Sequence, residues 1–249
     1  MKEAIIYLLA ITIAETVTTI GQPVWGIGCH ILILVAVILH SALGFSGKNR
    51  LQKLVLSLAL VPLVRIMSLS MPLANIPQIW WYPIVYIPLL AAAVAVVRIL
   101  GYKARDVGLN FGVLPVQLAV GLTGLVFGAV EYLILTEEAI ATGLALRETW
   151  LLTAFLLPLC TGFVEEFIFR GVLQRTAVEA FGWWGIVYVS FLFAILHMGY
   201  LSWVDVVFVF AVALFFGWVV KKTGSLFGVS ISHSITNLVL YVVIPSFLG

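Results

Sequence analysis

Polar residues of types that catalyse hydrolysis gather between residues 165 and 237 of an otherwise apolar chain. They form three short motifs: Glu-Glu-x-x-x-Arg at 165 to 170, Phe-x-x-x-His at 193 to 197 and His-x-x-x-Asn at 233 to 237. An ionisable side chain in hydrocarbon costs about 2.5 to 3.5 kcal/mol, so each one requires a partner or a function. Carboxylates and imidazoles are common general bases, and side-chain donors can stabilise an oxyanion. The motifs therefore predict a hydrolytic site.

The first motif contains two adjacent carboxylates that we expect to have different roles. Neighbouring residues of an α-helix point about 100° apart, so Glu165 and Glu166 cannot face the same spot. Arg170 follows Glu166 by four residues on the same face, where the two can form a charge-assisted hydrogen bond. This pairing leaves Glu165 free to face a cavity as a general base. The alternative is that all three residues form a purely structural ion cluster.

The second and third motifs supply candidate partners for Glu165. His197 and Glu165 each lie sixteen residues from Phe181, where we expect the chain to turn between two antiparallel helices, so both reach a similar depth. His233 and Asn237 are spaced i and i+4, which places them one above the other on one helix face. Two such donors suit an oxyanion, because neither adds negative charge. Hydrogen bonding between helices without catalysis is the alternative for each motif.

The elements that carry these motifs are predicted to be transmembrane helices. The chain of 249 residues is 63% hydrophobic and only 10% charged, far from the roughly 25% charged of a soluble domain. We expect an all-α fold, a polytopic transmembrane bundle of about 8 or 9 spans. A net charge of +2 without a basic patch excludes a nucleic-acid partner. The nine predicted helices cover residues 4–20, 25–44, 51–71, 79–100, 113–136, 149–177, 183–199, 203–220 and 226–246.

The distribution of positive charge predicts the orientation of these spans. Of the 13 Lys and Arg residues, eleven fall on one side of a nine-span arrangement, and the exceptions are Arg65, inside the third span, and Arg147. Because Lys and Arg collect in cytoplasmic loops, we expect a cytoplasmic N-terminus and an outside C-terminus. An eight-span arrangement would return the C-terminus to the cytoplasm. The compact chain without targeting or retention signals favours the plasma membrane of a prokaryote.

The ordered set of motifs closely resembles that of the CAAX protease and bacteriocin-processing family, also called the ABI family. The resemblance covers roughly residues 115 to 245. It divides the chain into N-terminal transmembrane helices at residues 1–112, which carry no recognised motif, and a catalytic helical core at residues 113–249. Members of this family are glutamate-dependent intramembrane endopeptidases, so the resemblance implies hydrolysis of a peptide bond in a membrane-associated or lipidated peptide or protein.

The resemblance also implies a role for each matched position. Glu165 is expected to act as the general base, aligning a water with His197, while His233 and Asn237 stabilise the oxyanion. Glu166 and Arg170 are expected to fix the helix geometry around Glu165. The resemblance favours a mechanism without a cofactor. Glu165, His197 and His233 are the alternative ligands of a divalent metal such as zinc.

Two other functions remain open from the residues alone. The protein could be a non-catalytic membrane scaffold or immunity factor of the same family, although the intact motifs argue against this. A transporter is compatible with buried charges, but the chain shows no internal symmetry and no paired broken helices. For an enzyme, the substrate could be a prenylated C-terminus, a bacteriocin leader, a peptide pheromone or a C-terminal membrane anchor.

Isolated polar residues elsewhere in the spans are expected to serve packing. Glu15 and Glu131 are expected to pair with neighbouring helices, with Arg65 as one possible partner. His30 and His40 are expected to be packing or interface residues.

Overall fold

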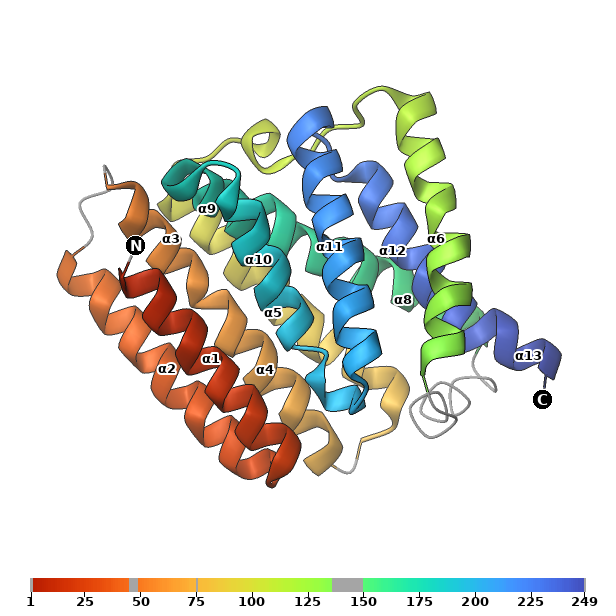
Figure 1. Ribbon diagram of the computed structural model, residues 1–249, viewed down its shortest axis with the longest axis horizontal. Helices are drawn as coiled ribbons and strands as arrows, with labels where there is room; N and C mark the ends of the chain where they lie inside the picture. Colours follow the sequence, from red (N-terminus) through yellow and green to blue (C-terminus); the bar gives the residue numbers. More distant parts are fainter. Residues whose placement is uncertain (1, 45–48, 75, 136–149, 249) are drawn as a thin grey trace.

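Each apolar run of the sequence forms helix in the computed structural model, which describes residues 2–44, 49–74, 76–135 and 150–248. This part of the chain contains no strand, which confirms the predicted all-α class. In Figure 1, α1 and α2 lie at one edge of the bundle and α6 and α13 at the other. The main helices are α1 (Lys2–Ile20), α2 (Pro23–Gly44), α3 (Arg50–Leu58), α4 (Leu60–Ser70), α5 (Trp81–Ile99), α6 (Leu114–Ile134), α8 (Trp150–Leu157), α9 (Gln174–Phe181), α10 (Trp184–Ile195), α11 (Trp203–Thr223), α12 (Phe227–Leu238) and α13 (Ile244–Leu248).

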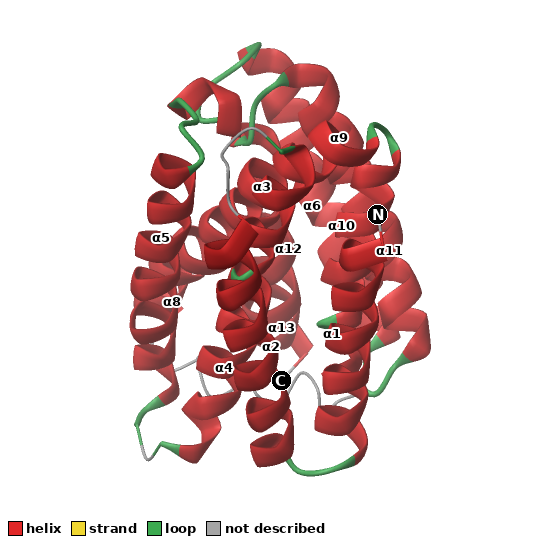
Figure 2. Cartoon of the chain, turned by 90° about the vertical axis from the view of Figure 1, so that its left-hand side faces the viewer, coloured by secondary structure: helices red, strands yellow, loops and turns green. Residues whose placement is uncertain are grey.

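Seven helical stretches in the described residues are long and apolar enough to cross a membrane. They are Lys2–Ile20, Pro23–Gly44, Arg50–Leu73, Trp81–Ile99, Leu114–Ile134, Trp203–Thr223 and Phe227–Phe247. Of the two other predicted spans, the seventh corresponds to a shorter apolar helix, Trp184–Tyr200, and the sixth to the composite helix described next. Figure 2 shows that most helices run in a similar direction, as in a polytopic bundle. The ends of the fifth and sixth predicted spans, residues 136 and 149, lie outside the described residues, as does Arg147.

The sixth predicted span differs from the uniform α-helix that the spacing argument assumed. Between α8 and α9 it widens into two π-helical segments, η5 (Pro158–Glu165) and η6 (Phe167–Leu173), which together carry the first motif. Pro158 opens the widened region, and a proline lacks the N–H that a regular helix would use there. Short π-helical turns inside α-helices are frequently found at functional sites. The angular argument that separated Glu165 from Glu166 therefore applies only approximately.

Glycines let α12 pack closely between α6 and η5. A Cβ on Gly124 of α6 would lie 2.2 Å from the carbonyl oxygen of Ser232, and one on Gly162 of η5 would lie 2.0 Å from Ser234 Oγ. Small residues at helix contacts allow backbones to approach in this way within membranes. The close packing brings the third motif, on α12, against the first motif, on the composite helix.

Segments rich in positive charge meet at one end of the bundle. Arg50 Nη1 donates to the carbonyl oxygen of Glu179 in α9 over 3.4 Å, and Lys53 Nζ lies 3.9 Å from the Glu179 carboxylate. Tyr102, from the loop after α5, donates to the same carboxylate over 2.6 Å. Asn110, further along that loop, donates over 2.6 Å to the carbonyl oxygen of residue 224, which follows α11. Four of the segments predicted to face the cytoplasm therefore share one end, while the side of the membrane that this end faces stays a prediction.

The N-terminal helices contain a separate buried ionic cluster. Arg65 of α4 donates to both carboxylate oxygens of Glu15 in α1, each over 2.6 Å. His30 Nε2 of α2 lies 2.9 Å from the same carboxylate, and Glu15 and His30 are completely buried. His40 Nδ1 lies 3.0 Å from the Tyr7 hydroxyl. The predicted pairing of Glu15 with Arg65 is confirmed, and both histidines make contacts between helices.

Candidate active site

The two glutamates of the first motif lie in different surroundings. Glu166 is completely buried, and Arg170 Nη1 donates to its Oε1 over 3.0 Å, which confirms the expected ion pair. The Arg170 guanidinium also lies over the ring of Phe193, 4.4 Å from its centroid. The Glu165 side chain, by contrast, keeps 18% of its surface exposed. Only Glu165 therefore remains accessible to a reactant.

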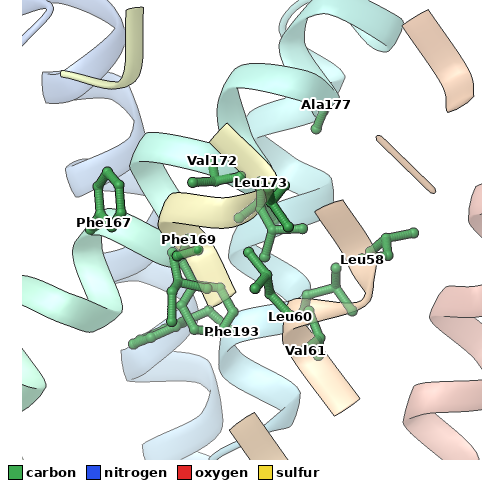
Figure 3. Packing of buried hydrophobic residues seen from close by; sticks show 14 of the residues in the cluster. Leu58, Leu60, Val61, Phe167, Phe169, Val172, Leu173, Ala177 and Phe193 are labelled. Carbon is green, nitrogen blue, oxygen red and sulfur yellow. The ribbon is translucent and has the colours of Figure 1, made fainter. Parts of the chain in front are cut away.

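Hydrophobic packing holds the motif-bearing helix in place. Phe167, Phe169, Val172 and Leu173 are each at most 2% exposed, and Figure 3 shows Phe169 and Leu173 near Phe193 and Leu60 of neighbouring helices. The ring of Phe169 meets that of Phe193 edge to face, with 4.9 Å between the centroids. Interiors packed in this way respond to even small changes of volume. The packing therefore sets the direction in which the glutamates point.

His233 links the two glutamates. Its Nδ1 lies 2.8 Å from Glu166 Oε1, and its Nε2 lies 3.9 Å from Glu165 Oε2. A carboxylate that contacts one imidazole nitrogen fixes the orientation of the ring and determines how the other nitrogen is used. Glu166 therefore positions His233 as well as pairing with Arg170. Sequence reasoning missed this contact, because the two residues lie 67 positions apart and no local pattern joins them.

Glu165 has a partner that the sequence did not indicate. The hydroxyl of Tyr86, in α5, donates a short hydrogen bond to Glu165 Oε1. Tyr86 belongs to the N-terminal helices, in which we recognised no motif, and a tyrosine in an apolar span gives no sequence signal of such a role. One carboxylate oxygen is thus engaged by α5, while the other faces His233.

His197 and Asn237 are also held by hydrogen bonds. His197 Nδ1 lies 2.9 Å from the carbonyl oxygen of Phe193, one turn earlier in α10. If this nitrogen carries the proton, Nε2 is left with a lone pair. Asn237 Nδ2 donates to Thr161 Oγ1, in η5, over 2.9 Å. An amide has two N–H donors, so one remains for a ligand.

A small cavity of about 40 Å³ brings three of the predicted site residues together. His197, His233 and Asn237 line it, and Phe127, Phe193, Phe208 and Phe216 contribute apolar walls. A space of this size can hold a water molecule, which requires about 10 to 15 Å³ on such a measure. Glu165 does not line this cavity. Its Oε2 lies 3.9 Å from Nε2 of His233, which does.

Glu131 of α6 also lines this cavity. It is 8% exposed, and no hydrogen bond or ion pair engages its carboxylate within the described residues. The sequence identified Glu131 only as an intramembrane carboxylate that we expected to pair with a neighbouring helix. Its position instead adds a carboxylate to the polar groups of the cavity.

The described residues contain no group of three or more His, Cys, Asp or Glu side chains arranged to hold a metal ion. The alternative ligands Glu165, His197 and His233 therefore do not form such a group here. His233 also directs Nδ1 to Glu166. The metal requirement of the protein stays a prediction that solution experiments must test.

Comparison with known families identifies the motif-bearing segment. Residues 147–239 match the family model described as type II CAAX prenyl endopeptidase Rce1-like. Together with the long apolar helices, this match indicates a multi-pass membrane protein that is similar to intramembrane endopeptidases of the CAAX type. The match supports the resemblance to the CAAX protease family seen in the motifs, and that family acts on peptide or protein substrates in the membrane. No curated protein and no solved structure matched the chain.

Proposed function

We propose that this protein hydrolyses a peptide bond of a membrane-associated or lipidated peptide or protein, using water activated by Glu165 and His197. The observation that carries the proposal is a water-sized cavity lined by His197, His233 and Asn237, with Glu165 3.9 Å from His233, in a segment that matches a family of endopeptidases. Three helical segments that are far apart in the sequence supply these side chains. A purely structural cluster requires neither an accessible carboxylate nor a cavity lined by histidines.

In the proposed reaction, Glu165 takes a proton from the water while the water oxygen attacks the scissile carbonyl carbon. The carbonyl oxygen becomes an oxyanion, which Asn237 and His233 stabilise by hydrogen bonds. The C–N bond then breaks, and Glu165 returns the proton to the leaving nitrogen. Free Nε2 of His197 accepts a hydrogen bond from the water and so helps to orient it.

The contact between His233 and Glu166 adds a condition to this mechanism. With the Nδ1 proton directed at Glu166, a neutral imidazole has no proton on Nε2 and cannot donate to an oxyanion. The oxyanion role therefore requires the doubly protonated form of His233, with Glu166 as its counter-charge. Arg170 in turn pairs with Glu166, so an alternating row of charges leads from Arg170 to Glu165.

The proposed activity is tested by comparing cells that express the wild-type chain with cells that express Glu165→Gln at the same level. Membrane fractions are searched for new protein termini and released peptides. We expect cleavage products that depend on Glu165, with Glu165→Asp as a matched variant that retains the carboxylate. An identical set of termini and an unaffected cellular phenotype in Glu165→Gln would support the scaffold alternative instead.

The substrate class requires a second experiment with defined peptides. Purified protein is incubated in lipid with a prenylated C-terminal peptide, its unprenylated counterpart and a leader-type peptide. We propose that the membrane-anchored substrate is cleaved faster, because anchoring raises its concentration at the site. Equal rates for the prenylated and unprenylated peptides would contradict a requirement for lipidation.

A further inference from the structure

A polar pocket of about 210 Å³ opens at the end of the bundle where positive charges meet. Three segments that are distant in sequence form it: the loop at residues 105–108, the helical stretch from 170 to 178 and the end of α11 near residue 221. Its volume is many times the roughly 10 to 15 Å³ that a water molecule requires on this measure, so it can admit a larger ligand. The charged residues of its lining are Arg105, Asp106, Arg170, Arg175 and Lys221.

Pairing within the protein leaves part of this positive charge uncompensated. Arg175 Nε donates to Glu179 over 2.9 Å, and Arg170 pairs with Glu166. Arg105 and Lys221 are exposed and have no ion-pair partner in the described part of the chain. Asp106, the one carboxylate of the lining, accepts a hydrogen bond from the backbone N–H of residue 103. The pocket therefore favours an anion.

The inner end of the pocket contains polar atoms without partners. Arg170 and Gln174 are 2% and 4% exposed, and both contribute to the lining. Arg170 Nη2 and Gln174 Oε1 have no hydrogen-bond partner among the described residues. Buried polar groups are nearly always hydrogen-bonded, so the Arg170 donor requires an acceptor from a ligand or water, whereas the Gln174 oxygen is an acceptor that water can satisfy.

The loop at residues 105–108, which forms one wall of the pocket, contacts the helix that carries the first motif. The backbone N–H of Leu226 donates to the Gly108 carbonyl oxygen over 2.9 Å. Gly108 has a φ of 77°, a left-handed conformation that glycine adopts without strain. A Cβ on Gly171 would lie 2.9 Å from the carbonyl oxygen of Val107, so this loop touches the helix directly after Arg170. The site is thus pre-organised, and its occupancy bears on the position of that helix.

We propose that this pocket binds a phosphate group, which the headgroup of an anionic phospholipid or free phosphate can supply. Guanidinium groups bind phosphate through two parallel hydrogen bonds, and lysine adds a point charge. Basic pockets between transmembrane helices are known sites for anionic headgroups. The end of the bundle that collects Lys and Arg residues lies where such headgroups would be found. Occupancy holds the loop against the composite helix and so stabilises the arrangement of Glu165 and Glu166.

The test uses the full-length protein and a pair of double variants that remove the same charge. Arg105→Gln/Lys221→Gln removes two exposed cations of the pocket, while Arg98→Gln/Lys222→Gln removes two exposed cations at the same end that do not line it. Native mass spectrometry measures retained lipid, and thermal unfolding is followed in phosphatidylcholine nanodiscs with and without phosphatidylglycerol. A third arm adds inorganic phosphate to the protein in detergent.

We expect wild type and the Arg98/Lys222 variant to retain phosphatidylglycerol and to gain thermal stability from it. The Arg105/Lys221 variant should bind phosphatidylglycerol roughly tenfold to thirtyfold more weakly and should not gain thermal stability from it. Each cation near the membrane surface contributes to the affinity for an anionic headgroup. Stabilisation by phosphatidylglycerol alone identifies a lipid site, and equal stabilisation by phosphate in detergent identifies a free-anion site.

Equal binding by all three proteins, or an equal loss in both double variants, would overturn the proposal, because the effect would then come from general surface charge. Arg105→Lys/Lys221→Arg keeps both charges and should retain binding, which guards against loss by misfolding. None of these readouts requires proteolysis, so the proposal can fail or succeed independently of the proposed function.

Discussion

Glu15 in α1 and Glu166 in the composite helix are both completely buried, and each pairs with an arginine and a histidine. The two carboxylates differ in how many of their oxygen atoms accept hydrogen bonds. Arg65 engages both oxygens of Glu15, whereas Glu166 Oε2 has no hydrogen-bond partner in the described residues and its Oε1 is shared by Arg170 and His233. Beside Glu166 lie the accessible Glu165 and the cavity that His233 lines.

This difference separates a structural ionic cluster from a chemical one. A bidentate arginine satisfies a buried carboxylate and leaves no oxygen for a reactant. A site for chemistry instead keeps some polar atoms available and holds them with neighbours that are themselves fixed. Intramembrane charge alone therefore does not identify an active site, because both clusters contain it. The accessible Glu165 and the cavity beside the second cluster distinguish it.

Replacement of Glu165 should have the largest effect on activity. We expect Glu165→Gln to lower kcat/KM by about 10²- to 10⁴-fold, because it removes the general base. Since this side chain is partly exposed, folding should be little affected. Peptide cleavage and thermal unfolding of the same purified samples check both points. Retained cleavage in a folded Glu165→Gln variant would contradict the assignment of chemistry to the second cluster.

Asn237→Ala tests the oxyanion role. Loss of one oxyanion donor should lower kcat by about 10²- to 10³-fold with little change in KM. Asn237→Asp is a matched variant of similar size that replaces the donor with an acceptor and should be at least as impaired. The measurement is steady-state kinetics. A rise in KM with an unchanged kcat would instead assign Asn237 to substrate binding.

Tyr86→Phe tests whether α5 contributes to the site. Loss of a hydrogen bond to a charged group costs about 1.5 to 3 kcal/mol, so we expect a loss of roughly tenfold to a hundredfold in kcat. Tyr7→Phe, at the His40 contact in the N-terminal helices, is a control that removes a hydroxyl remote from Glu165. Equal activity of Tyr86→Phe and wild type would show that Glu165 does not depend on this bond.

Replacement of Glu15 in the first cluster should instead lower the stability of the protein and leave its activity nearly unchanged. Glu15→Gln should reduce the free energy of unfolding by about 3 to 5 kcal/mol, because Arg65 loses its counter-charge. Activity per folded molecule should stay within about twofold. The double variant Glu15→Gln/Arg65→Met should recover much of the stability, since no unpaired charge remains. A loss of kcat in folded Glu15→Gln protein would show that the two clusters are coupled.

Metal removal is expected to have the smallest effect. The resemblance favours a glutamate mechanism, so treatment of active purified protein with a chelator should leave the cleavage rate unchanged. Elemental analysis of the same sample provides the control. A stoichiometric metal whose removal abolishes cleavage and whose return restores it would contradict the metal-free mechanism.

Much of the fold was predictable because lipid imposes simple rules on sequence. Apolar runs marked the helices, and the spacing of Glu166 and Arg170 predicted their ion pair correctly. The π-helical turns were not predictable, because they depend on how the helix packs rather than on its apolar pattern alone. The contact of Tyr86 with Glu165 could not be inferred, since it joins helices 79 positions apart without a pattern in either.

The sequence by itself determined the class of structure and the residues capable of chemistry, since both depend on residue type and local spacing. Only the tertiary structure decided which polar groups on different helices meet. It completed the bonding of Glu15 and placed His233 between the two glutamates. It also brought Glu131 to the cavity and gathered the cations of the anion pocket. The physical reason is that these contacts depend on the direction and depth of packed helices, which close glycine contacts and buried side chains set together.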